Sequence, residues 1–191
     1  MGGVKIMLPL VPVALVGVGI YGIWRYFNPQ ASSPVSDTVT SIQQTASDVV
    51  QSITDLFPKA APYQDAISNA QNQYGIPNNY LAKLLNAESS FDPAIISGQR
   101  KSSTGATGIA QFMPATANDL GVNPTDPIAS IDASGKYLSQ LFDKFQDWPK
   151  AIAAYNWGMG NVERKGLTKA PAETINYVKK IAGVDITQSG G

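Results

Sequence analysis

The sequence lacks cysteine and histidine, and it carries little glutamate. Its 191 residues contain no Cys and no His, which excludes disulfides, a cysteine nucleophile, a Ser-His-Asp triad and zinc sites with the usual ligands. The 14 basic and 14 acidic side chains balance, so the overall charge gives no support to nucleic-acid binding. Any catalysis must therefore use carboxylates, hydroxyls, amides or lysine, and the only glutamates are Glu88, Glu163 and Glu173.

A long apolar run stands near the start of the chain. Ile6–Trp24 carries no charged side chain and is flanked by Lys5 and Arg25. As a helix it would span about 28 Å, close to the hydrocarbon core of a bilayer. The run predicts one transmembrane helix that anchors the chain to a lipid bilayer. A buried core helix and a cleaved signal peptide are the alternatives, but the run is apolar on all faces and no small-residue cleavage site follows it.

The basic residues around this run favour one orientation. Lys5 and the amino terminus precede the run, whereas residues 26–58 contain no Lys or Arg. Because positive charge is retained in the cytoplasm, we expect the bulk of the chain on the periplasmic or extracytoplasmic side. The sequence thus predicts a single-pass membrane protein, in a cell envelope or in the membrane of a bacteriophage virion.

Changes in composition divide the chain into four parts. Residues 1–27 are the predicted anchor, residues 28–59 a linker with an amphipathic stalk, residues 60–185 a globular domain, and residues 186–191 a flexible tail. Apolar residues in the stalk follow an a/d heptad spacing over residues 39–56, which is typical of self-association. A helix lying on the next domain and a polar spacer are the alternatives.

The globular part is predicted to be all-α. Apolar residues recur at helical spacing, and no segment alternates like a strand. The helical segments are residues 63–74, 81–88, 128–145, 151–157 and 171–182, with a short turn after Pro114. Residues that favour helix ends support these bounds, with Asp126 and Pro127 at the start of the longest segment and Gly75, Gly121 and Gly183 after others.

Glu88 shares a helix face with three leucines. It follows Leu81, Leu84 and Leu85 by seven, four and three positions, and residues at these spacings lie together. Desolvation on such a face raises the pKa of a carboxyl above its ordinary value of about 4.3. A carboxylic acid that stays protonated near neutral pH can protonate a leaving oxygen. A glutamate at the solvent edge, or one paired with Lys or Arg, is the alternative.

Two further segments carry side chains suited to a ligand. The segment GATGIAQFMPAT (Gly105–Thr116) predicts a tight loop that brings the Gln111 amide close to a ligand. The segment AAYNWGMGNV (Ala153–Val162) ends a small-residue helix with Tyr155 and Asn156, whose flat faces and polar tips suit sugars. Taken singly, each is equally compatible with ordinary core and turn residues.

Four ordered motifs together resemble one family. ESSFDPAIIS (Glu88–Ser97), the two segments above and PAETINYVKKI (Pro171–Ile181) stand in the order of the soluble-lytic-transglycosylase-like (SLT) domain. The resemblance covers about Ala60–Gly183. It implies a two-lobed helical domain with the goose-type lysozyme fold. It also implies that the substrate is peptidoglycan, cleaved between N-acetylmuramic acid and N-acetylglucosamine.

The resemblance implies a role for each matching residue. Glu88 matches the single catalytic acid/base, and Glu173 is expected to orient or support the site. The Tyr155 hydroxyl is expected to hold the Glu88 carboxyl. The positions expected to contact the glycan are Ser97, Gln111, Met113, Tyr155, Asn156 and Tyr177.

One segment departs from the family pattern. Gly98–Thr104 is longer than usual and adds Arg100 and Lys101. It would reshape one end of the glycan groove or contact acidic peptide stems of peptidoglycan. A solvated insertion is the alternative, and the assignment of Ser97 depends on which holds.

The resemblance also implies a mechanism with one carboxylate and without water, metal or cofactor. Glu88 would protonate the glycosidic oxygen and then take the proton of the muramic acid C6 hydroxyl, which attacks C1 and closes a 1,6-anhydro ring. Asp92 precedes Pro93, so we interpret it as a turn residue and not as a second catalytic carboxylate. The alternatives are a muramidase that leaves reducing ends and a catalytically silent glycan-binding or assembly protein. Local wall opening, in phage entry or by a secretion or conjugation apparatus, would suit an enzyme of this kind.

Overall fold

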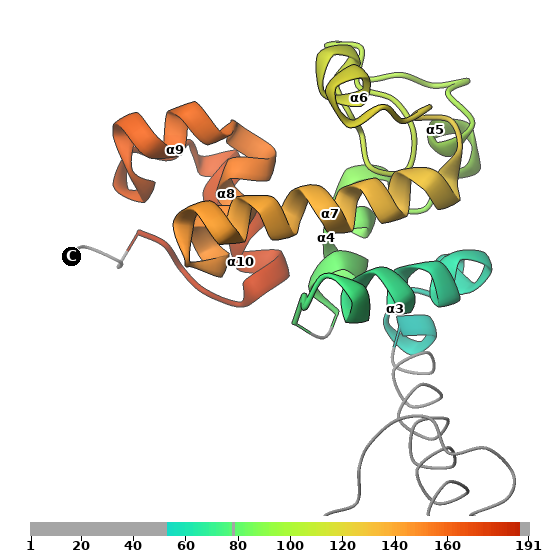
Figure 1. The fold of residues 1–191 in the computed structure, drawn as a ribbon, viewed down its shortest axis with the longest axis horizontal. Coiled ribbons are helices and arrows are strands. Elements are labelled where there is room, and N and C mark those ends of the chain that lie inside the picture. The colour runs from blue at the N-terminus through green and yellow to red at the C-terminus, as the bar shows by residue number, and fades with distance from the viewer. Residues whose placement is uncertain (1–52, 78, 188–191) are drawn as a thin grey trace, which may run out of the picture. The chain divides into compact units, whose positions relative to one another are not determined.

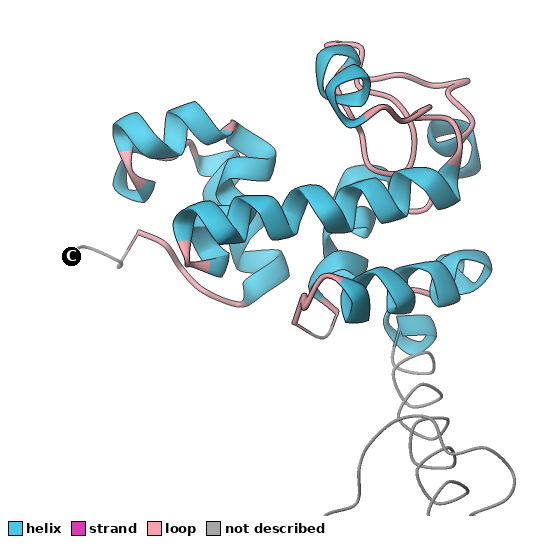
Figure 2. Cartoon of the chain, in the orientation of Figure 1, coloured by secondary structure: helices cyan, strands magenta, loops and turns pink. Residues whose placement is uncertain are grey.

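The computed structural model describes residues 53–77 and 79–187, and the regular elements in these ranges are all helices (Figure 2). A single isolated bridge, between Thr107 and Phe112, interrupts the loops there. The all-α prediction is therefore confirmed for this part of the chain.

The helices and two short 3-10 segments follow one another with brief connections, apart from the long loop between α5 and α6. In chain order they are η1 (Pro58–Tyr63), α3 (Gln64–Gln73), α4 (Tyr80–Ser89), α5 (Pro93–Ile96), α6 (Pro114–Leu120), α7 (Pro127–Phe145), α8 (Trp148–Trp157), α9 (Met159–Lys165), η2 (Leu167–Lys169) and α10 (Ala172–Ala182).

The core is arranged around α7 and α8. The long helix α7 crosses the domain, and α8 packs against α7, α9 and α10 (Figure 1). Ala151–Ala154 of α8 is fully buried, because three of these four side chains are alanines that allow neighbouring helices to approach closely. On the other side of the core α3 packs on α7, and α4 contacts α3, α7 and α10. This packing places the carboxyl end of α4 beside α10.

The helix ends follow the local chemistry of the sequence. The Asp126 carboxylate accepts hydrogen bonds from the backbone N–H groups of Ile128 and Ala129, each at 3.1 Å. Gly121 and Gly183 end α6 and α10 with φ angles of 64° and 73°, which glycine adopts without steric cost. These predicted caps are confirmed. Ile128 lies in the first turn of α7 at the surface and is 52% exposed, whereas Ile131, one turn further on, is fully buried.

The predicted transmembrane helix, residues 6–24, lies outside the described residues, and so do the linker and most of the stalk. Within residues 53–77 and 79–187, no helix has the length and apolar character needed to cross a membrane. The last turn of the predicted stalk, residues 53–56, is helical. Its Ile53 is fully buried in the domain core, as is Ile186 near the other end. The core thus extends beyond residues 60–185 in both directions.

Candidate active site

Glu88 lies in the last turn of α4, on the face that the helix buries. Leu81, Leu84 and Leu85 are fully buried, and Glu88 is half-buried beside them. Complete burial of a leucine stabilises the fold by about 1.5–3 kcal/mol. The three leucines therefore fix the orientation of α4 and hold a carboxyl in a largely apolar environment.

The surroundings of Glu88 change its acidity. The pKa of Glu88 is raised from 4.5 to about 7, and burial is the largest cause of the increase. Two smaller influences are included in this value: Tyr177 of α10 donates a hydrogen bond to Glu88 Oε1, which lowers the pKa, and the negative charge of Glu173 raises it. Both protonation states of the carboxyl are thus accessible near neutral pH, so the same group can give a proton and take one back.

Two tyrosines lie close to this carboxyl, and they have different partners. Tyr177 donates to Glu88, whereas the Tyr155 hydroxyl donates to the backbone oxygen of Ala110 at 3.2 Å. Burial, with the charge of Glu88, raises the pKa of both phenols well above the ordinary value, so both remain donors. Tyr177 therefore takes the role that the sequence assigned to Tyr155. The reason is tertiary, because α10 packs directly on α4 while Tyr155 on α8 reaches the loop before α6.

The loop that carries Gln111 has a constrained backbone. Gln111 adopts a φ of 47°, a backbone conformation that residues other than glycine rarely adopt. Its Nε2 donates to the Gly108 backbone oxygen at 2.9 Å. In the described ranges, no hydrogen bond reaches its Oε1. Gly108 has a φ of 83°, and a Cβ there would lie 1.7 Å from the Pro124 backbone oxygen. The loop therefore fits only with glycine at that position, and it presents Gln111 with its carbonyl oxygen available.

Asn156 follows Tyr155 at the end of α8 and is tied to α10. The hydroxyl of Thr174 donates to Asn156 Oδ1 at 2.7 Å. No role is predicted for Thr174 from the sequence alone. A signal was present, since Thr174 precedes Tyr177 by three positions and therefore shares its helix face. Tyr137 of α7 is a second residue that the sequence did not predict at this site. Its ring packs on Tyr155 with centroids 5.5 Å apart.

The remaining predicted residues are not joined to this cluster. Ser97 is exposed at the end of α5 and donates a long hydrogen bond of 3.4 Å to the Ala94 backbone oxygen. Met113 is 43% exposed before α6. In the described part of the chain, no hydrogen bond links either side chain to Glu88. Glu173 is exposed in the first turn of α10 and acts on Glu88 through its charge.

The longer segment Gly98–Thr104 is connected to α5. Arg100 forms an ion pair of 2.6 Å with Asp92, which also accepts the backbone N–H of Ala94 at 2.8 Å as the cap of α5. The Ala94 and Arg100 hydrogen bonds lower the pKa of Asp92. Asp92, which the sequence analysis interprets as a turn residue, is thus the N-terminal cap of α5, and Arg100 is directed toward α5.

The described residues contain no cluster of side chains suited to a metal ion. No group of three or more acidic side chains among them could hold a metal ion.

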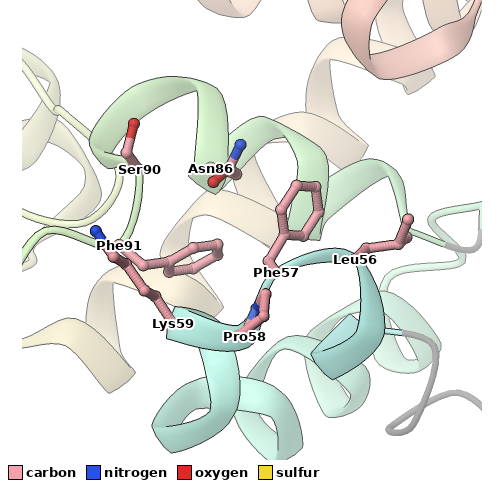
Figure 3. A pocket seen from close by; sticks show the side chains of 7 residues that line it. All are labelled: Leu56, Phe57, Pro58, Lys59, Asn86, Ser90 and Phe91. Atoms are coloured by element: carbon pink, nitrogen blue, oxygen red, sulfur yellow. The ribbon is translucent and has the colours of Figure 1, made fainter.

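A pocket of about 420 Å³ is lined by residues 56–59 together with Asn86, Ser90 and Phe91 (Figure 3). Asn86 and Ser90 each lie two positions from Glu88, which is about 200° around a helix. The pocket therefore lies on the other face of α4 and does not include Glu88.

Comparisons with known proteins point to one family. The family model described as the transglycosylase SLT domain matches residues 65–178. A transglycosylase of Enterobacteria phage PRD1 is 31% identical over 126 residues, which cover 65% of this chain and 46% of that protein. Peptidoglycan transglycosylase gp16 of Escherichia phage T7 is 32% identical over 149 residues, covering 68% of this chain and 11% of that protein. Membrane-bound lytic murein transglycosylase D of Escherichia coli (strain K12) is 27% identical over 182 residues, covering 83% of this chain and 39% of that protein. The chain thus spans less than half the length of these relatives.

Proposed function

The chain belongs to the transglycosylase SLT domain family, and from this premise we propose that it is a lytic transglycosylase that cleaves the glycan strands of peptidoglycan. The observation that carries the proposal is the environment of Glu88. A half-buried carboxyl with a pKa of about 7, held by a tyrosine hydroxyl, suits a reaction in which one group acts as acid and then as base. The domain would have the lysozyme-like, two-lobed fold that the resemblance implies.

The proposed reaction cleaves the bond between N-acetylmuramic acid and N-acetylglucosamine. The protonated Glu88 gives its proton to the glycosidic oxygen as the C1–O bond breaks. The resulting carboxylate takes the proton of the muramic acid C6 hydroxyl, whose oxygen bonds to C1 and closes the 1,6-anhydro ring. Glu88 ends protonated again, so the atoms balance without water. The amides of Gln111 and Asn156 would contact the sugars beside Glu88, with Ser97 and Met113 farther along the strand.

A muramidase is the second candidate, and Glu173 is the observation that favours it. Ordinary glycosidases use two carboxylates, one of which can serve a water molecule. Glu173 lies close enough for its charge to raise the pKa of Glu88. If Glu173 activated water, the product would carry a reducing end in place of the anhydro ring. We favour a supporting role for Glu173, because its charge raises the pKa of Glu88 while no hydrogen bond joins the two carboxyl groups in the described residues. A silent glycan-binding protein is a third candidate, which the Tyr177–Glu88 hydrogen bond disfavours, because it holds a carboxyl suited to proton transfer.

The proposal extends to the parts of the chain that precede the domain. Residues 6–24 would anchor the protein in a bilayer, with the catalytic domain on the periplasmic or extracytoplasmic side. Of the predicted stalk, residues 39–52 would self-associate, because Ile53 is already buried in the domain core. Two of the relatives named above belong to phages and one is named as membrane-bound. Local opening of the cell wall, in phage entry or by a secretion or conjugation apparatus, is the role we propose.

The decisive experiment compares two glutamine variants of the full-length chain in a mild detergent. Glu88→Gln keeps the shape of the side chain but removes its proton chemistry, and general acid–base catalysis contributes about a hundredfold or more to rate. We expect release of soluble fragments from purified peptidoglycan to fall by about that factor. Glu163→Gln is the matched control, because Glu163 pairs with Lys144 at the surface. Equal activity of Glu88→Gln and wild type would overturn the assignment of Glu88.

A further inference from the structure

The Asn156 amide is held in one of its two orientations by a buried hydroxyl. Thr174 is 1% exposed, and its Oγ1 lies 2.7 Å from Asn156 Oδ1. The Thr174 side chain has no other hydrogen-bond partner in the described ranges. With the amide turned, Oγ1 could accept from Nδ2, but the hydrogen of the buried hydroxyl would then have no acceptor, which is costly. The hydrogen is therefore directed to the Asn156 oxygen.

This contact decides which polar atom Asn156 offers to a ligand. Its Oδ1 is engaged by Thr174, while its Nδ2 donates to no group in the part of the chain that the structure describes. The side chain is only half-buried. The terminal torsion of asparagine has broad, roughly two-fold minima, so without Thr174 the amide could turn and offer its oxygen instead. Thr174 thus makes Asn156 a hydrogen-bond donor.

Asn156 lies in the neighbourhood of Glu88. Its chain neighbour Tyr155 is close enough for the charge of Glu88 to raise the pKa of the phenol. Thr174 and Tyr177 share one face of α10, and Tyr177 donates to Glu88. One face of α10 therefore holds the candidate catalytic carboxyl and also the Asn156 amide.

A fixed donor distinguishes among the groups that a sugar carries. A sugar hydroxyl both donates and accepts, so it can pair with either orientation of an amide. A carbonyl oxygen only accepts, so it requires the N–H groups. The acetamido group of an N-acetylated sugar carries such an oxygen, and the corresponding free amine does not.

We propose that Thr174 is a positioning residue that turns the Asn156 amide so that Nδ2 donates to the acetamido carbonyl oxygen of an N-acetylated sugar. Thr174 touches no substrate and acts through Asn156. The proposal rests on the proposed function in one respect, namely that a glycan binds beside Glu88. It adds a source of selectivity for N-acetylated over de-N-acetylated strands.

The test measures binding, so that catalysis does not enter it. The full-length Glu88→Gln chain, in mild detergent, is titrated with chitohexaose and with its fully de-N-acetylated counterpart. Addition of Thr174→Val removes the hydroxyl at nearly constant volume. We expect the affinity for chitohexaose to fall by about threefold to tenfold, the range of one neutral hydrogen bond. The affinity for the de-N-acetylated chain should stay unchanged, and Thr174→Ser should restore the acetylated preference. Thr168→Val, at an exposed threonine, is the matched control.

Several results would overturn the proposal. Equal loss of affinity for both oligosaccharides would show a merely structural role, and so would a failure of Thr174→Ser to restore binding where Thr174→Val lowers it. Unchanged affinity for chitohexaose in Thr174→Val, or no binding of chitohexaose before that change, would contradict it directly. The proposed function fails separately. If the wild-type chain released no peptidoglycan fragments while Thr174→Val still changed the preference, the activity would be excluded and the positioning role would stand.

Discussion

At the scale of single residues, the acidity of Glu88 is set by opposing influences. Burial raises its pKa, the Tyr177 hydrogen bond lowers it, and the charge of Glu173 raises it. The hydrogen bond favours the ionised carboxyl, whereas burial and a neighbouring negative charge disfavour it. Each neighbour can therefore be removed with a predictable direction of change.

The two neighbours should move the pH dependence of activity in opposite directions. Activity that needs protonated Glu88 is lost as pH rises through its pKa. Tyr177→Phe removes the hydrogen bond, raises that pKa and shifts the alkaline limb of the kcat/KM profile to higher pH. Glu173→Gln removes the charge, lowers the pKa and shifts the limb to lower pH. The measurement is the initial rate of fragment release between about pH 5 and 9.

Glu163→Gln is the control for this pair and should leave the limb in place. Shifts of both variants in the same direction would contradict the account of the Glu88 environment. A lower rate at every pH without a shift would show that the neighbours only support the fold.

At this scale, contacts between residues of one helix could be predicted from the sequence, whereas contacts between helices far apart in the chain could not. The burial of Glu88 followed from its spacing to Leu81, Leu84 and Leu85, all within two turns of one helix. The choice between Tyr155 and Tyr177 as its partner did not follow, because it depends on α10 packing against α4. A periodic pattern within one helix contains no information on which of two distant tyrosines meets it.

At the scale of elements, α10 and the loop before α6 position the site. One face of α10 supplies Thr174 and Tyr177, and the loop supplies Gln111. The loop depends on a close approach at Gly108, where a Cβ would lie 1.7 Å from the Pro124 backbone oxygen. Gly105 has a similar φ, 89° against 83°, but a Cβ there would meet nothing within 4 Å.

This pair of glycines separates backbone strain from steric contact. Gly105→Ala should lower the free energy of unfolding by about 1 kcal/mol, the cost of a left-handed φ for alanine. Gly108→Ala carries that cost and also forces the loop away from Pro124. We expect it to destabilise by about 3 kcal/mol or more and to reduce fragment release. Urea unfolding of both variants checks this, and equal destabilisation by the two would contradict the close approach.

The longer elements were predictable, and the shortest were not. The apolar spacing predicts helices α7, α8 and α10. Asp126 and Pro127 mark the start of α7, and Gly183 marks the end of α10. Helices α5 and α9 contain only 4 and 7 residues, too few turns for a periodic pattern. Their bounds come from contacts such as the Asp92–Arg100 pair, which tertiary structure creates.

At the scale of the whole molecule, the proposal couples a membrane anchor to an enzyme. The central test of the anchor is one charge in the apolar run. A basic residue at the centre of a membrane helix costs about 2.5–3.5 kcal/mol. Leu15→Arg should therefore shift the chain from the membrane fraction to the alkaline carbonate wash, whereas Leu15→Val should stay with wild type in the membrane. Release of the wild-type chain by that wash would contradict the anchor.

The central claim is that Glu88 alone cleaves the glycan, with the substrate's own hydroxyl as nucleophile. Digestion of peptidoglycan in ¹⁸O-labelled water, followed by mass spectrometry of the new chain ends, tests it most directly. The account predicts 1,6-anhydromuramic acid ends without incorporated label. Reducing ends that carry one ¹⁸O atom would contradict it and would identify a hydrolase.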